Sequence, residues 1–168
     1  ITPWPHQRTI SDTAYSIYPE NLLFCDEVGL GKTIEAGLTV SRLLHTGKAS
    51  TALFLTPAGL MEQWQEELLS LFNIHAYRVD NRYDGVYLVG PDITGHEIKL
   101  GENPPTTDST RNWGESIFAD VVDSSGGPNV IIESWHRARR DSNIGDVAPD
   151  VSNNVWDVTV VDEAHSAS

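Results

Sequence analysis

Two glycines, a lysine and a threonine stand close together near the start of the chain, in the run Gly29-Leu30-Gly31-Lys32-Thr33. Glycines let the backbone turn tightly, so that successive N–H groups can point at one anion. A lysine directly after such a turn suits the β and γ phosphates of a nucleotide, and a following hydroxyl suits Mg²⁺. The run therefore predicts a phosphate-binding loop, and a chance glycine-rich turn is the alternative.

Two adjacent carboxylates, Asp162 and Glu163, follow an apolar run at 158–161 near the other end of the chain. Open α/β sheets bind ligands at the carboxyl ends of their strands. Asp162 fits a metal-holding carboxylate that shares Mg²⁺ with Thr33, and Glu163 is placed to polarise an attacking water. A polar strand end without chemistry is the alternative for both.

Both motifs need strands and helices to position them. A short apolar run at 21–25 predicts a buried strand before the glycines, and a largely buried helix is expected from Thr33 to His45. Residues 90–112 are rich in Pro, Gly, Thr and Asp, which predicts a long exposed loop or insertion. Further strands are expected at 52–55, 74–79, 86–89, 130–132 and 155–161, and helices at 10–17, 58–72 and 113–123. This alternation predicts an α/β fold with a mostly parallel sheet and helices on both faces.

Composition limits the class of protein. The chain has 168 residues, which suits one domain, and its formal net charge is −13. That charge argues against binding nucleic acid over the whole surface, although a small basic strip remains possible. The carboxylates are dispersed, so a salt-loving source is one hypothesis and an ordinary acidic domain the other. One cysteine, Cys25, excludes a disulfide framework, and the lack of a signal-like start or a long apolar run indicates a cytoplasmic protein.

The two motifs carry a family resemblance. The runs Asp26-Glu27-Val28-Gly29-Leu30-Gly31-Lys32-Thr33 and Asp162-Glu163-Ala164-His165 resemble the first RecA-like lobe of superfamily-two helicase-like ATPases of the Swi/Snf group. The stretch 26–38 is most similar to the bacterial and archaeal branch associated with RNA polymerase. Asp26, where phosphate loops usually have Gly or Ala, is then a family variation. The resemblance implies a P-loop fold, ATP and Mg²⁺ as cofactors, and catalytic roles for Lys32 and Glu163.

Two further segments resemble family motifs. Pro5-His6-Gln7 is similar to an upstream element whose glutamine reads the adenine base, which gives that role to Gln7; a surface glutamine near a proline turn is the alternative. Leu55-Thr56-Pro57 resembles a motif in which Thr56 and neighbouring N–H groups would contact a nucleic-acid phosphate; a simple helix N-terminus is the alternative. Trp64, on the apolar stripe of the helix expected at 58–72, is interpreted as a core anchor rather than a platform for stacking bases.

The densest positive charge lies in the segment 134–140, which holds Arg137, Arg139 and Arg140. This segment follows the strand expected at 130–132 and is similar to the family's next motif for contacting nucleic acid. A solvated basic turn that pairs with nearby carboxylates is the alternative. His165 belongs to the second motif, and local packing or hydrogen bonding is the alternative for it.

The resemblance also implies partners. These are duplex DNA, RNA polymerase or other DNA-bound proteins, and a second RecA-like lobe of the same chain. That lobe carries the family's arginine fingers and is not among the 168 residues, so a longer protein is expected. A DEAH-type helicase, the motor subunit of a restriction or phage-defence system, and a nucleotide-binding module without turnover stay open as alternatives.

Overall fold

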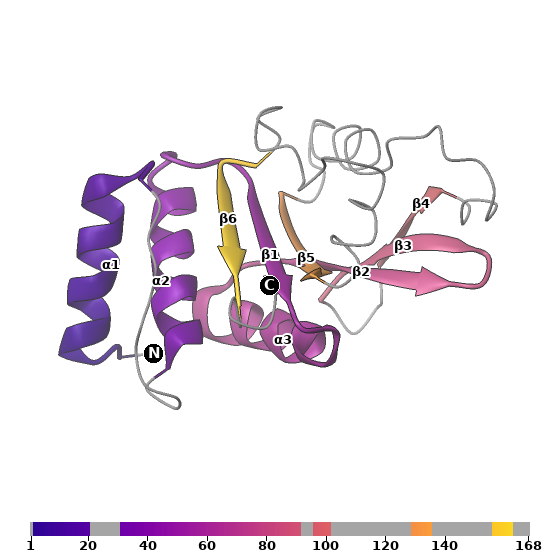
Figure 1. Ribbon diagram of the computed structural model, residues 1–168, viewed down its shortest axis with the longest axis horizontal. Helices are drawn as coiled ribbons and strands as arrows, with labels where there is room; N and C mark the ends of the chain where they lie inside the picture. Colours follow the sequence, from indigo (N-terminus) through magenta and orange to yellow (C-terminus); the bar gives the residue numbers. More distant parts are fainter. Residues whose placement is uncertain (1, 21–30, 92–95, 102–128, 136–155, 163–168) are drawn as a thin grey trace.

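The computed structural model describes residues 2–20, 31–91, 96–101, 129–135 and 156–162. These residues form helices and one six-stranded sheet (Figure 1). The helices are α1 (Pro5–Ile17), α2 (Lys32–His45), the 3-10 helix η1 (Ala58–Leu60) and α3 (Met61–Phe72). The strands are β1 (Ala52–Thr56), β2 (Tyr77–Arg82), β3 (Gly85–Val89), β4 (Glu97–Gly101), β5 (Val130–Ser134) and β6 (Val158–Val161). The predicted α/β fold is confirmed.

The strands are ordered β4-β3-β2-β5-β1-β6 across the sheet. β1 pairs in parallel with both β5 and β6, so that Phe54 lies opposite Ile132 on one side and Val160 on the other. β2 is parallel to β5, whereas β2–β3 and β3–β4 are antiparallel. The sheet is thus parallel around β1, so that β5, β1 and β6 end at the same edge, and Asp162 follows the last of them.

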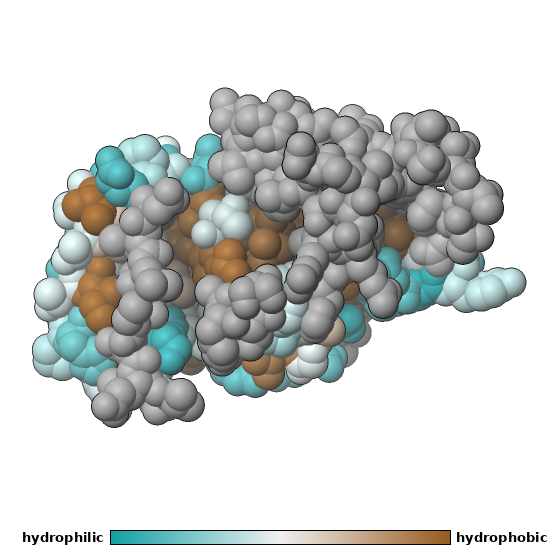
Figure 2. Space-filling view, in the orientation of Figure 1, coloured by the Kyte–Doolittle hydropathy of each residue, from teal (hydrophilic) through white to brown (hydrophobic). Residues whose placement is uncertain are grey.

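The core lies between this sheet and the helices. Every residue of β1 is buried, and Trp64 and Leu68 of α3 belong to the same apolar cluster. The side of the sheet seen in Figure 2 shows apolar surface in its middle, over β6 and β1. α2 packs against α3 so closely that a Cβ on Gly37 would lie 2.3 Å from the ring of Phe72, so any larger residue at this position would displace that ring.

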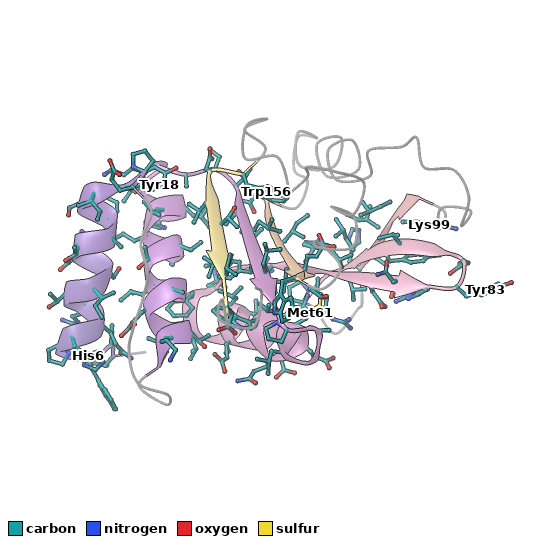
Figure 3. All side chains as sticks on the ribbon, in the orientation of Figure 1. His6, Tyr18, Met61, Tyr83, Lys99 and Trp156 are labelled. Carbon is teal, nitrogen blue, oxygen red and sulfur yellow. The ribbon has the colours of Figure 1, made fainter. Side chains whose placement is uncertain are left out.

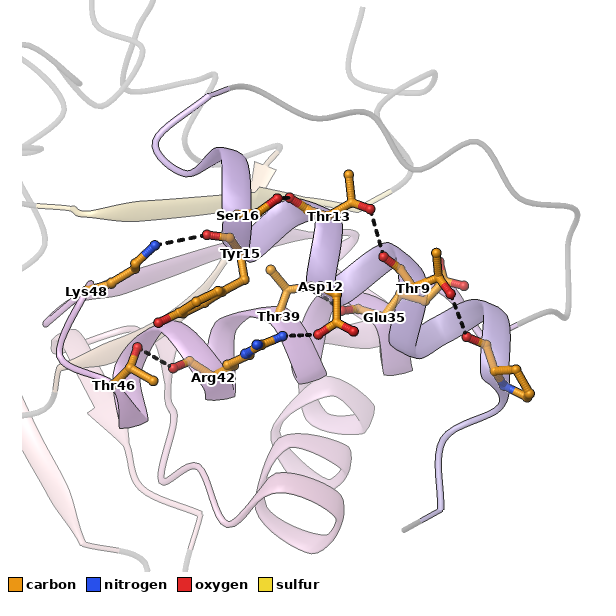
Figure 4. A network of polar contacts seen from close by, with 11 residues as sticks. Thr9, Asp12, Thr13, Tyr15, Ser16, Glu35, Thr39, Arg42, Thr46 and Lys48 are labelled. Carbon is orange, nitrogen blue, oxygen red and sulfur yellow. Dashed lines mark hydrogen bonds and ion pairs between the residues drawn. The ribbon is translucent and has the colours of Figure 1, made fainter.

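α1 lies alongside α2, and polar side chains form part of the contact between the two helices (Figure 4). Arg42 of α2 forms an ion pair with Asp12 of α1. Two cations lie over the ring of Tyr15. The Arg42 guanidinium is 4.1 Å and the Lys48 ammonium 4.0 Å from the ring centroid. These cation–π contacts join Tyr15, near the carboxyl end of α1, to Arg42 in the last turn of α2.

α1 begins earlier than the sequence predicts. The expected helix over 10–17 in fact starts at Pro5, which stands in the first turn, where a missing N–H costs nothing. The backbone N–H of Trp4 donates to Oε1 of Gln7 at 2.9 Å and so caps the helix. Pro5 is therefore part of a helix start that was not predicted from the sequence.

Two predictions in the middle of the chain are wrong in detail. The strand expected over 74–79 is displaced to Tyr77–Arg82, because the N–H of Ile74 is used to end α3 by donating to Leu68 O at 3.0 Å. The loop expected over 90–112 contains β4, which pairs with β3. Arg82 of β2 donates to Glu97 of β4 at 2.8 Å, and this hydrogen bond lowers the pKa of the Glu97 carboxyl.

Other predictions stay untested. The strand expected over 21–25 and the helix expected over 113–123 lie outside the described residues. The prediction of helices on both faces of the sheet depends partly on 113–123 and stays a prediction. Within the described ranges, no helix combines the length and apolar character needed to cross a membrane.

Gln65 joins α3 to the sheet and provides a first test of this packing. Its buried amide Nε2 donates to Ala76 O at 2.9 Å and to Val89 O at 2.8 Å. Replacing Gln65 with leucine removes the donor from two carbonyls, and each unsatisfied buried group costs about 1–3 kcal/mol. We therefore expect the free energy of unfolding, measured by urea titration, to fall by about 2–6 kcal/mol.

The matched control is Gln63→Leu on the same helix. Gln63 is exposed, and its Nε2 donates to Oε1 of Glu67 at 2.8 Å. Surface substitutions of this kind change stability by about 0.5 kcal/mol or less. Equal losses in the two variants would contradict a specific role for the Gln65 amide.

Candidate functional site

Several element ends meet at one end of the molecule. In Figure 1, α1 and α2 begin at the lower end of the view, and the arrows of β1 and β6 point to that same end. The parallel register of β1 and β6 requires that their carboxyl ends lie side by side. The sequence places Lys32 and Asp162 at two of these ends, so both predicted motifs are brought to one end of the lobe.

Gly31 is the residue from which α2 starts. It has a left-handed backbone with φ of 85°, which side chains rarely allow. Gly31 O accepts the N–H of Ile34 at 2.8 Å and so begins the helix. A Cβ on Gly31 would also lie 2.8 Å from Nε2 of Gln7. Glycine is therefore required here by both backbone conformation and space.

Lys32 and Thr33 form the first turn of α2, immediately after this glycine. The N-terminus of a helix is the positive end of its dipole and presents backbone N–H groups, which together favour a phosphate. The helix predicted from Thr33 to His45 is confirmed and begins one residue earlier. Gly29 and Leu30, the other predicted members of the loop, lie outside the described residues.

Gln7 lies against this turn. Its side chain is 3% exposed, so the alternative of a surface glutamine is wrong. Oε1 accepts the N–H of Trp4, and Nε2 faces Gly31. The contacts of Gln7 thus connect the start of α1 with the start of α2, and its predicted role in reading adenine stays a prediction.

Asp162 follows directly on β6 and is held at two points. Its backbone N–H donates to Leu55 O at 2.9 Å, which continues the pairing with β1. Its carboxylate Oδ2 accepts the indole N–H of Trp64 at 2.9 Å. Trp64 is 4% exposed, so its interpretation as a core anchor is confirmed, although its bond to Asp162 was not predicted. Glu163 and His165 lie outside the described residues.

The residues predicted to contact nucleic acid are Thr56 at the end of β1 and three arginines that follow β5 in the sequence. Thr56 is fully buried at the end of β1, and its hydroxyl donates to Pro57 O at 3.2 Å. Its side chain does not face solvent, which argues against the phosphate contact expected of it; the exposed residues at this point are Ala58 and Gly59. Arg137, Arg139 and Arg140 lie beyond the part of the chain that the structure describes.

Two buried acidic residues were missed. Glu35, one turn after Lys32, is 0% exposed, and His6 Nε2 of α1 lies 3.8 Å from its carboxylate. Glu133 of β5 is also buried, opposite Leu55 of β1. A charged residue inside an otherwise apolar helix or strand was the available signal for each of them.

His6 at the start of α1 and Met61 at the start of α3 lie on the two sides of this end of the lobe (Figure 3).

Residues 6–167 match the family described as SNF2-related domain. The chain belongs to this family. It is therefore an SNF2-related lobe of the RecA-like α/β class, as the sequence predicted.

A curated relative agrees with this membership. The chain is 29% identical over 161 residues to the "RNA polymerase-associated protein RapA" of Sodalis glossinidius (strain morsitans). The match covers 96% of this chain and 13% of the relative, so the SNF2-related chain spans a small part of that protein's length. The similarity places it near the RapA branch.

The residues at this end of the SNF2-related lobe fit a nucleotide with Mg²⁺. Gly31 allows close backbone approach, Lys32 supplies positive charge, and Asp162 supplies a carboxylate. In the described ranges, no group of three or more His, Cys, Asp or Glu side chains could hold a metal ion by itself. Mg²⁺ is usually bound by one or two carboxylates together with substrate phosphates and waters.

Proposed function

We propose that this chain is the ATP-binding lobe of a DNA-dependent ATPase that moves along duplex DNA and remodels protein–nucleic acid complexes. The observation that carries the proposal is the start of α2 at a left-handed glycine, with Lys32 in its first turn, at the same end of the lobe as Asp162. A nucleotide phosphate and its metal fit these groups, and the SNF2-related family membership supports ATP.

Each group of the loop and strand end has a proposed role. The backbone of Gly29, Leu30 and Gly31 surrounds the phosphates, and Lys32 contacts the β and γ phosphates. Thr33 and Asp162 hold Mg²⁺, which when bound neutralises charge on the phosphates. Glu163 accepts a proton from the water that attacks the γ phosphate. Gln7 is proposed to contact the adenine from its position beside Gly31.

The proposed nucleic-acid partner is duplex DNA. The relative's printed name refers to RNA polymerase, which makes polymerase or another DNA-bound protein a proposed partner as well. Since the net charge of the chain is −13, binding to phosphates requires a local basic strip. Arg137, Arg139 and Arg140 are the proposed strip. A second RecA-like lobe of the same protein is proposed to complete the active site with arginine fingers.

The test is ATP turnover by the full-length protein with and without nucleic acid. We expect duplex DNA to stimulate turnover more than RNA does. Replacing Arg137, Arg139 and Arg140 with alanine should weaken DNA binding for all sequences and reduce the salt slope by about one per lost phosphate contact. Turnover in the absence of DNA should be unchanged in this variant.

The alternatives give different outcomes. Stimulation by RNA rather than DNA would favour a DEAH-type helicase. Separation of DNA strands during turnover would favour a helicase or a restriction-type motor over a duplex translocase. Nucleotide binding without any turnover by the full-length protein would leave a binding module only.

A further inference from the structure

Asp162, at the end of β6, accepts a hydrogen bond from the indole of Trp64. Among the contacts of the described residues, Trp64 is the one side chain of α3 that donates to this strand end. We propose that Trp64 is a positioning residue that fixes the Asp162 carboxylate for the bound Mg²⁺–nucleotide. This inference rests on the proposed function, because it assumes that Asp162 holds the metal. It assigns a part in metal binding to a tryptophan of α3 that is far from the phosphate loop in sequence.

The indole is itself held rigidly. Its ring lies 5.2 Å from that of Phe54 in the fully buried β1, at an interplanar angle of 47°. One turn further along α3, Leu68 is fully buried in the same cluster. A side chain packed within a buried apolar cluster has little freedom, so the direction of its N–H is defined before any ligand binds.

The hydrogen bond suits a carboxylate that must also bind a cation. An indole N–H can only donate, and a buried one usually finds an acceptor. An ionised carboxylate has about four lone-pair sites, so it can accept the Trp64 N–H on Oδ2 and still coordinate a metal. Because the acceptor is charged, the bond is about twice as strong as a neutral one.

The backbone of Asp162 is fixed independently. Its N–H donates to Leu55 O at 2.9 Å, so β1 sets the position of the main chain. The Trp64 bond then restricts the remaining freedom, which is rotation of the side chain. Groups that orient a metal ligand in this way typically change metal affinity or activity by about 10- to 100-fold when they are removed.

The test is Trp64→Phe in the full-length protein. Phenylalanine keeps an aromatic ring against Phe54 but has no N–H. Mn²⁺ serves as the probe, and its binding to the protein–ATP complex is followed by the electron paramagnetic resonance signal of free Mn²⁺. We expect Mn²⁺ to bind about 10-fold or more weakly. ATP binding in excess EDTA should be unchanged, and kcat should fall at saturating Mg²⁺ with little change in the KM for ATP.

Phe54→Leu is the matched control, since it disturbs the same packing and keeps the Trp64 N–H. An equal loss of Mn²⁺ affinity in Phe54→Leu would show that packing, rather than the hydrogen bond, is responsible, and would overturn the inference. Unchanged Mn²⁺ affinity in Trp64→Phe would also overturn it, while leaving the proposed function intact. Failure of the unmodified protein to bind Mn²⁺ with ATP would overturn both.

Discussion

Replacing Lys32 with alanine is expected to weaken ATP and ADP binding by about 10- to 150-fold, because hydrogen bonds to charged groups contribute about 1.5–3 kcal/mol. Lys32 stands in the first turn of α2, directly after the left-handed Gly31. Its loss leaves the helix N-terminus and the loop backbone in place, so binding should be weakened rather than abolished. Titration with a fluorescent ADP analogue in the presence of Mg²⁺ measures the change.

Thermal unfolding gives an independent measure of the same effect. A ligand present at 100 times its Kd stabilises the folded state by about 2.7 kcal/mol. For a domain of this size, that corresponds to a rise in Tm of roughly 5–10 °C. At the same nucleotide concentration, Lys32→Ala should lose most of the rise.

The matched control is Lys48→Ala. Lys48 contacts the ring of Tyr15 and donates to Tyr15 O at 3.1 Å, in the contact between α1 and α2. Removing it takes away the same charge without touching the start of α2, so nucleotide affinity should not change. Similar losses of affinity in both lysine variants would mean that general positive charge, and not the phosphate loop, attracts the nucleotide.

Glu163→Gln in the full-length protein is expected to lower DNA-stimulated ATP turnover by about 10²- to 10⁴-fold, the range contributed by a positioned general base. Glutamine has a similar shape but cannot accept a proton from water. Steady-state phosphate release measures kcat. Since Glu163 is not proposed to hold the phosphates, the affinity for ATP should stay close to that of the unmodified protein.

The two variants therefore separate binding from chemistry. Lys32→Ala should raise the Kd for nucleotide, whereas Glu163→Gln should bind nucleotide and fail to turn it over. Retention of more than about a tenth of the kcat in Glu163→Gln would place the base elsewhere. In that case Asp162, the neighbouring carboxylate held by Trp64, would still be available for the metal.

The strongest local patterns in the sequence predicted the fold well. The apolar stripe over 58–72 predicted one helix, which the structure has as η1 followed by α3. The short apolar runs predicted β1, β3 and β5 close to their observed bounds. The Gly31-Lys32-Thr33 sequence predicted a turn and a helix start, and the structure has both. These features depend on neighbours in sequence, which is why periodicity and glycine placement could find them.

The missed features depend on contacts between distant segments. Trp64 was correctly placed in the core, yet its bond to Asp162 joins residues from α3 and the end of β6, and no pattern in one sequence pairs them. The strand Tyr77–Arg82 was predicted to begin too early, because Ile74 looks like the start of a strand. In the structure Asn73 and Ile74 instead end α3, through a left-handed cap. Thr56 was expected to face a ligand, but it is fully buried at the end of β1, where it pairs with Ser134 of β5.

The order of strands in the sheet has a consequence for synthesis on the ribosome. β1 emerges early, yet its hydrogen-bonded neighbours β5 and β6 begin only at Val130 and Val158. The antiparallel strands β2, β3 and β4 follow one another and can pair soon after they emerge. β1 has no partner strand close to it in sequence, so it stays unpaired until β5 and β6 have been synthesised. Unpaired apolar strands of this kind are prone to aggregate. The edge that carries Asp162 is therefore the last part of the described sheet to be completed.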